Sequence, residues 1–131
     1  MKYISTDKAP EAIGPYSQAV EINGILYTSG QIPLIPETGA MAEGDIETQT
    51  EQVIKNLAEV LKSAKSDFTK VIKTTCYLKN MNDFAKFNEI YGKYFISKPA
   101  RACVEVAALP KGALVEIEAI AEVEKNPVMK L

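Results

Sequence analysis

The chain contains no histidine, the residue that most often transfers protons and binds metals near neutral pH. It excludes Ser-His-Asp and Cys-His nucleophile systems, histidine-ligated zinc and histidine general bases. Neither of the glycine motifs that cradle phosphates, GxxxxGK[ST] and GxGxxG, occurs. If the protein is an enzyme, its proton chemistry must come from Glu, Asp, Tyr, Cys or Lys.

Cysteine is scarce, and long apolar runs are missing. Cys76 and Cys103 lie in separate strand-like runs without a CxxC pair, which favours reduced thiols over a disulfide framework. No segment approaches the ~20 apolar residues of a membrane helix, and Asp7 precedes any apolar run that could act as a signal peptide. We therefore expect a cytoplasmic protein that does not enter a membrane.

What is present is the composition of an ordinary globular domain. The 131 residues are 47% hydrophobic and 24% charged, which predicts one domain over 1–131 that folds without a disulfide or a metal. The net charge is −2 and no block of like charge occurs. Because phosphate binding depends on clustered basic charge, we do not expect nucleic acid as the main ligand.

Turn signals and hydrophobic periodicity define the first half of the chain. The pair Asn23-Gly24 predicts a hairpin between strands over 17–22 and 25–31. The most regular pattern is an amphipathic helix over about 46–65, with Asp45 as its N-cap.

The second half alternates strands with one further helix. Strands are predicted over 71–78, 101–107 and 114–123. Asn82 is a candidate cap for the intervening helix, which Pro99 ends, and Asn88 should lie at the edge of its buried face. The whole order predicts an α+β fold with an antiparallel or mixed sheet and both helices on one face.

Arginine is the rarest basic residue that the chain contains. Arg101 is the only arginine, and every other basic side chain is a lysine. Arginine offers a planar fork that grips a carboxylate or phosphate with two parallel hydrogen bonds, which lysine cannot do. Arg101 is therefore a candidate anion-binding residue. A lone surface arginine in a lysine-rich chain is the alternative explanation.

Alternation over the last two strands predicts a polar face. Arg101, Cys103 and Glu105 alternate with apolar residues, and the strand over 114–123 carries Glu116 and Glu118 on one side. A short turn joins the two strands, so we expect them to pair and these five side chains to share the face that points away from the helices. That face is either solvated or forms a subunit interface or cleft.

The functional interpretation of this face needs two roles. Arg101 would hold an anionic group, and Glu116 or Glu118 would position or deprotonate a water molecule. Charged pairs on sheets are also common structural features, so the residues alone leave both readings open.

Three further residues are weaker candidates. Cys103 is better explained as a small buried hydrophobe than as a nucleophile, because no base accompanies it. Tyr16 and Ser29 each lie beside turn-forming residues, where side chains often face a ligand. Each is also explained as a structural residue.

Motifs spread over nearly the whole chain resemble the RidA/YjgF family of reactive intermediate deaminases. They are AIGPYSQA over 12–19, TSGQIP over 28–33, VIKTT over 71–75, LKNMNDF over 78–84, PARACVEVA over 99–107 and VEIEA over 115–119. Their common order and spacing make the resemblance specific.

The resemblance implies a chorismate-mutase-like α+β fold assembled as a homotrimer, with three sites at the subunit interfaces. Members of this family hydrolyse 2-imino acids such as 2-iminobutanoate and 2-iminopropanoate, which are tautomers of enamines released by PLP-dependent dehydratases. The products are 2-oxo acids and ammonia, and no cofactor or metal is needed. Holdase-like, endoribonuclease and translation-inhibitory activities are also reported for family members, and they form the alternative function.

Matching positions imply the roles of individual residues. Arg101 would bind the substrate carboxylate and Glu116 would handle the water, while Cys103 would contribute mainly through its backbone. The remaining pocket positions are matched by Tyr16, Ser29, Gly30 and Asn88. The chain departs from some relatives at Ala108, where they carry a second arginine.

Overall fold

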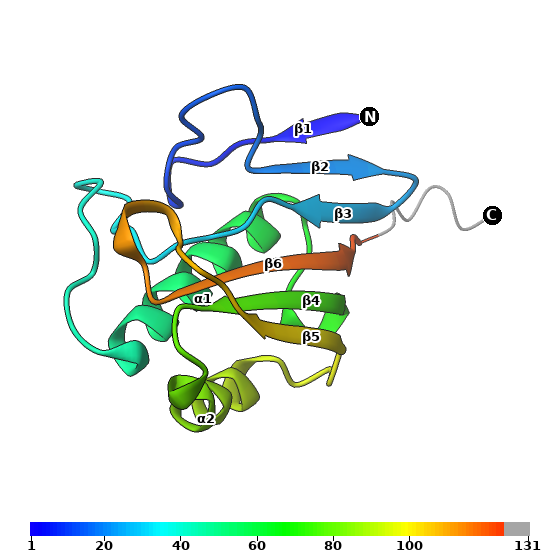
Figure 1. Ribbon diagram of the computed structural model, residues 1–131. Coiled ribbons are helices and arrows are strands. Elements are labelled where there is room, and N and C mark those ends of the chain that lie inside the picture. The colour runs from blue at the N-terminus through cyan, green and yellow to red at the C-terminus, as the bar shows by residue number, and fades with distance from the viewer. Residues whose placement is uncertain (125–131) are drawn as a thin grey trace.

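One six-stranded sheet organises residues 1–124, the part of the chain that the computed structural model describes (Figure 1). Its strands are β1 (Lys2–Ile4), β2 (Ala19–Ile22), β3 (Ile25–Thr28), β4 (Val71–Leu78), β5 (Ala100–Glu105) and β6 (Val115–Glu122). They lie in the order β1-β2-β3-β6-β4-β5, and every neighbouring pair is antiparallel except β4 and β5. The prediction of a mixed, mostly antiparallel sheet in an α+β fold is confirmed.

Two helices cover one face of this sheet, as the sequence predicts (Figure 1). Helix α1 (Ile46–Ser63) begins after Asp45, whose side chain accepts a hydrogen bond from the backbone N–H of Thr48 at 3.1 Å. Its apolar face, including Val53 and Leu57, is buried against the sheet. Within residues 1–124 no helix combines the length and hydrophobicity that a bilayer crossing requires.

Helix α2 (Phe84–Tyr94) begins differently from the prediction. A short 3₁₀ turn, Met81–Asp83, precedes it, and the side chain of Asn80 caps that turn by accepting from the N–H of Asn82. Asn82 is therefore inside the turn and does not cap the helix. Strand β1 was not predicted, because three residues are too few to show an alternating pattern.

The predicted pairing of the last two strands is wrong. β4 lies between β5 and β6, and β5 runs parallel to β4. Parallel neighbours need a long crossover, which α2 provides. The short segment after β5 therefore carries the chain past β4 to the strand beyond it, instead of closing a hairpin.

This pairing places the polar side chains on two different faces. Arg101 and Cys103 share the face of their register partners on β4, Thr74 and Cys76, which is the face covered by the helices. On β6 it is Val115, Ile117 and Ala119 that are buried, so Glu116 and Glu118 point to the open face of the sheet. The expected single polar face does not exist.

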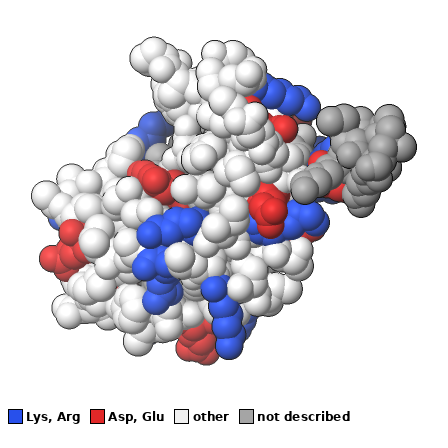
Figure 2. Space-filling view, turned by 90° about the vertical axis from the view of Figure 1, so that its right-hand side faces the viewer, with Lys and Arg blue, Asp and Glu red and all other residues white. Residues whose placement is uncertain are grey.

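The side of the molecule where β6 ends and β4 begins carries mixed charge. Basic and acidic side chains lie next to one another there (Figure 2).

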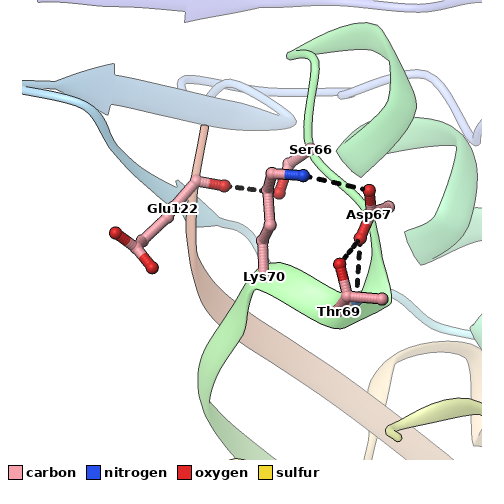
Figure 3. A network of polar contacts seen from close by, with 5 residues as sticks. All are labelled: Ser66, Asp67, Thr69, Lys70 and Glu122. Atoms are coloured by element: carbon pink, nitrogen blue, oxygen red, sulfur yellow. Dashed lines mark hydrogen bonds and ion pairs between the residues drawn. The ribbon is translucent and has the colours of Figure 1, made fainter. Parts of the chain in front are cut away.

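A polar network connects the segment before β4 with the end of β6 (Figure 3). Ser66 Oγ donates to the carbonyl of Glu122 at 2.6 Å, and Asp67 accepts from the N–H of Thr69 at 2.8 Å and from Lys70 Nζ at 3.3 Å. Hydrogen bonds from Thr69 hold the pKa of Asp67 below its ordinary value, so this network stabilises the connection between α1 and β4.

Candidate active site

Arg101 lies on β5 with its head group over α2. Its Nη1 donates to Asn88 Oδ1 at 2.6 Å, and its Cζ lies 4.8 Å from the ring centre of Tyr91 and 5.5 Å from that of Phe84. Asn88 is one turn from both aromatic residues, as its predicted place at the edge of the buried face requires. We call these four residues the arginine half-site.

The arginine half-site opens into a cavity between α2 and β5. The cavity has a volume of about 580 Å³ and is lined by Arg101, Asn88, Tyr91 and neighbouring residues of the chain that links α2 to β5. Arg101 itself is exposed, so its fork of donors is accessible to an anion.

The cysteines flank Arg101 on the helix-covered face. Cys103 is half-buried against the core, and Cys76, its partner in the β4–β5 register, is fully buried. Burial raises the pKa of the Cys103 thiol and raises that of Cys76 to about 12. Both thiols are therefore protonated near neutral pH, which agrees with the interpretation of Cys103 as a packing residue.

Glu116 lies on the opposite face and is half-buried. Its carboxylate rests against the backbone at Gly30, where any Cβ would overlap the carboxylate oxygen. Burial raises the pKa of Glu116 above its ordinary value, and the nearby charge of Glu118 raises it further. We call Glu116 and Gly30, together with Ser29 and Tyr16, the glutamate half-site.

Backbone hydrogen bonds hold Gly30 against β6. Gln31 and Ile117 exchange two of them, with N–O distances of 2.8 and 3.2 Å. On the other side of Gly30, Ser29 Oγ donates to the carbonyl of Ser17 at 2.5 Å. The Ser29 hydroxyl therefore fixes the path of the chain beside Gly30.

Tyr16 stands at the rim of a second cavity. Its side chain is 55% exposed, and it lines a cavity of about 310 Å³ together with Gly30, Gln31 and Lys111. Gly30 thus contacts both this cavity and the Glu116 carboxylate, so a ligand in the cavity would lie close to Glu116.

The second glutamate of the pair has a different environment. Glu118 accepts a hydrogen bond from the Tyr77 hydroxyl at 3.1 Å. In the described part of the chain no side chain donates such a bond to Glu116. Glu116 combines a raised pKa with carboxylate oxygens that no side chain of residues 1–124 bonds, which suits a proton acceptor.

Arg101 and Glu116 do not meet within one chain, although the sequence predicts that they lie close together. Arg101 pairs with Thr74 and Glu116 pairs with Tyr77, three residues further along β4 and on its other side. With about 3.3 Å per residue and 4.8 Å per strand, their Cα atoms are roughly 14 Å apart, and their side chains leave opposite faces of the sheet. A small substrate cannot touch both groups of the same chain.

Sequence reasoning missed the contact of Phe84 and Tyr91 with Arg101. Their spacing of four and three residues from Asn88 was the available signal. This spacing could not be connected with Arg101, because the sequence predicted that β5 pairs with β6 instead of β4.

Known proteins resemble this chain over nearly its whole length. The mouse 2-iminobutanoate/2-iminopropanoate deaminase is 55% identical over 121 residues, covering 92% of this chain and 90% of the mouse protein. A protein of the Rid family from Yersinia pestis, YyfA, has a crystal structure that matches with a TM-score of 0.91 at 56% identity, covering 93% of this chain and 98% of that one. The crystal structure of Escherichia coli TdcF with bound serine matches with a TM-score of 0.89 at 40% identity, covering 95% and 100%.

The family comparison agrees with these relatives. The family described as Endoribonuclease L-PSP matches residues 6–123, which include both half-sites. The chain therefore belongs to the Endoribonuclease L-PSP family, the RidA/YjgF family that its motifs indicate.

Proposed function

We propose that this protein hydrolyses 2-imino acids such as 2-iminobutanoate and 2-iminopropanoate to 2-oxo acids and ammonia, without a cofactor and in the cytoplasm. The mouse, human and rat relatives named for this activity are 53–55% identical to the chain. The observation that carries the proposal is the complementary chemistry of the two half-sites: an accessible arginine fork and a carboxylate with a raised pKa.

The reaction follows from these two groups. Arg101 binds the substrate carboxylate with two hydrogen bonds and leaves C2 of the imine directed towards Glu116. Glu116 accepts a proton from water as the water oxygen bonds to C2 and the C=N double bond becomes single. Glu116 then returns this proton to the nitrogen, which gives a carbinolamine. It next accepts the hydroxyl proton and passes it to the amino nitrogen, so the C–N bond breaks, ammonia leaves and the 2-oxo group forms.

The two half-sites come from different chains in this proposal. Because Arg101 and Glu116 of one chain leave opposite faces, a complete site needs Arg101 of one copy beside Glu116 of another. Copies that repeat this head-to-tail contact close into a ring, and we propose the homotrimer with a chorismate-mutase-like arrangement that the family resemblance implies.

The open face of the sheet has the mixed character expected of such a contact. Besides Glu116 and Glu118 it carries Tyr27 and Val104, each 44% exposed. Exposed aromatic side chains such as Tyr27 are enriched at subunit interfaces. Tyr16, Ser29, Gly30 and Asn88 complete the substrate pocket, and the backbone of Cys103 adds a contact to the carboxylate.

The activity can be measured by coupling a threonine or serine dehydratase to the purified protein. The dehydratase releases the imine, and the absorbance of the imine should decay faster in proportion to the added protein. An unchanged decay rate would refute the proposed deaminase, and a search for nuclease or holdase activity would then take its place.

Shared sites can be tested by mixing two inactive variants, Arg101→Ala and Glu116→Gln. After equal amounts are unfolded and refolded together, about a quarter of the interfaces should join an intact arginine to an intact glutamate. Activity should therefore recover to about a quarter of the wild-type level, whereas each variant refolded alone stays inactive. A site within one chain predicts no recovery, and sedimentation as a monomer at micromolar concentration would also exclude the trimer.

A further inference from the structure

An aromatic floor lies beneath the only arginine of the chain. Arg101 is on an edge strand and is exposed, yet its guanidinium is 4.8 Å from the ring centre of Tyr91 and 5.5 Å from that of Phe84. Both distances are within the ~6 Å at which a cation is attracted to the face of an aromatic ring. The head group is thus restrained in a place where solvent would otherwise leave it free.

Tyr91 is itself held by contacts on several sides. Its hydroxyl hydrogen-bonds with Thr74 Oγ1 at 2.7 Å, and Thr74 is the residue on β4 that pairs with Arg101. Its ring stacks on Phe95 with centroids 4.1 Å apart and an angle of 16° between planes, and Phe87 lies 5.7 Å away. Tyr91 is only 7% exposed, so the ring face presented to Arg101 is a rigid surface.

The remaining contact fixes how the fork is turned. Asn88 Oδ1 accepts from Nη1 of Arg101, and this bond uses one of the five donors of the guanidinium. The ring below sets the plane of the group, and the amide beside it sets the rotation within that plane. The donors away from Asn88 are then presented together to an incoming carboxylate.

We propose that Tyr91 is a positioning residue that orients Arg101 for the substrate, with Thr74 locking the tyrosine in place. This inference rests on the proposed function for the identity of the anion, a 2-imino acid carboxylate. Its physical content, that the Tyr91 ring orders the guanidinium, does not depend on that function. The competing explanation is that Tyr91 only fills the core between α2 and the sheet.

The single arginine allows a direct test by NMR. In the assembled, ¹⁵N-labelled protein only Arg101 gives an arginine Nε–Hε signal, and a ring face beneath the guanidinium shifts the Hε resonance upfield. Tyr91→Leu should move this signal towards its random-coil position and narrow it, because the group becomes mobile. Tyr91→Phe keeps the ring and should preserve the upfield shift, although loss of the Thr74 bond loosens it slightly.

Phe87→Leu is the matched control. Phe87 is a fully buried ring on the same helix, one turn before Tyr91, and its truncation removes core packing beside Tyr91 while both rings beneath Arg101 remain. It should leave the Arg101 signal in place. If Tyr91→Leu and Phe87→Leu leave the signal equally unchanged, the positioning role is wrong.

Kinetics provide the second readout. Because the ring acts through carboxylate binding in both ground and transition states, Tyr91→Leu should raise KM about tenfold and change kcat little, as expected for losing a partly desolvated cation–π contact. The dissociation constant for 2-oxobutanoate should rise by the same factor, while Tyr91→Phe stays within about twofold of wild type. A fall in kcat at constant KM would overturn the inference.

The two proposals fail separately. If the wild-type protein does not hydrolyse imines but the NMR signal behaves as described, the deaminase fails and the positioning role stands. If Tyr91→Leu does not fold, Phe84→Leu removes the other, less buried ring of the floor, and it should show a smaller shift of the Arg101 signal in the same direction. An unchanged signal in that variant would overturn the role of the floor.

Discussion

The arginine and glutamate half-sites are built by opposite means. Arg101 is exposed, and side chains of α2 hold its head group by a hydrogen bond and two ring faces. Glu116 is half-buried and rests on bare backbone at Gly30, next to the two backbone bonds between Gln31 and Ile117. The first environment keeps a cation accessible and oriented, and the second raises the pKa of an acid. Substitution of a supporting side chain should therefore disturb the first half-site, whereas the support of the second should be disturbed by added bulk at Gly30.

The largest effect is expected at Glu116. Glu116→Gln keeps the shape but cannot accept a proton, so imine hydrolysis should fall by roughly 10² to 10⁴ while the assembly remains intact. Glu118→Gln is the matched control, because Glu118 is already bonded to Tyr77, and its rate near neutral pH should change little. Steady-state kinetics on both variants decide the matter. An inactive Glu118→Gln beside an active Glu116→Gln would reverse the assignment of the two carboxylates.

Arg101→Lys tests whether charge alone is enough in the arginine half-site. Lysine keeps the positive charge but loses the planar fork and the match to the Tyr91 ring, so kcat/KM should fall about a hundredfold, nearly as far as in Arg101→Ala. Comparing kcat/KM for the two variants gives the answer. Retention of most activity in Arg101→Lys would mean that the geometry of the fork is unimportant.

Gly30→Ala tests whether the glutamate half-site depends on the space that the Gly30 backbone leaves for the Glu116 carboxylate. The new methyl group would collide with the Glu116 carboxylate, which is the end of a flexible side chain and can swing away. We expect activity to fall about ten- to a hundredfold, the kind of loss that misplacement of a catalytic group by about 1 Å causes, with little change in melting temperature. A variant that melts far below wild type, or one that stays fully active, would show that Gly30 has another role.

The smallest effect concerns pH. Glu116 must be ionised to accept a proton, so kcat/KM should rise with pH through a pKa above the ordinary value for glutamate. Removing the like charge in Glu118→Gln lowers the pKa of Glu116, so this acidic limb should move to lower pH, by less than about one unit. A pH–rate profile of both proteins measures the shift. Movement to higher pH would mean that Glu118 does not act through its charge.

Much of the fold could be predicted because its signals are local. The spacing of apolar residues defines α1, and the limits of β4 follow from its run of strand-forming residues. The pairing of β5 could not be predicted in this way. A short connection favours a hairpin, whereas the actual partner is chosen by the α2 crossover and by burial of Thr74 and Cys76.

The candidate residues were easier to identify than their arrangement. Arg101 stands out by its rarity, and the family motifs indicate Glu116, Gly30 and the pocket positions. Placing Arg101 and Glu116 on one face was wrong, because that inference depended on the strand pairing. The reason for glycine at position 30 was also hidden, since it is a contact with a side chain from a strand distant in the sequence.

Opposite placement of the two half-sites has a consequence for how activity depends on expression. Under the proposed assembly a newly synthesised chain carries half of two different sites and is inactive until it meets other copies. At low cellular levels the catalytic output should then climb more steeply than the amount of protein. A cell that makes few copies would hydrolyse its imines at a lower rate per copy. The rate would increase sharply once synthesis passes a threshold.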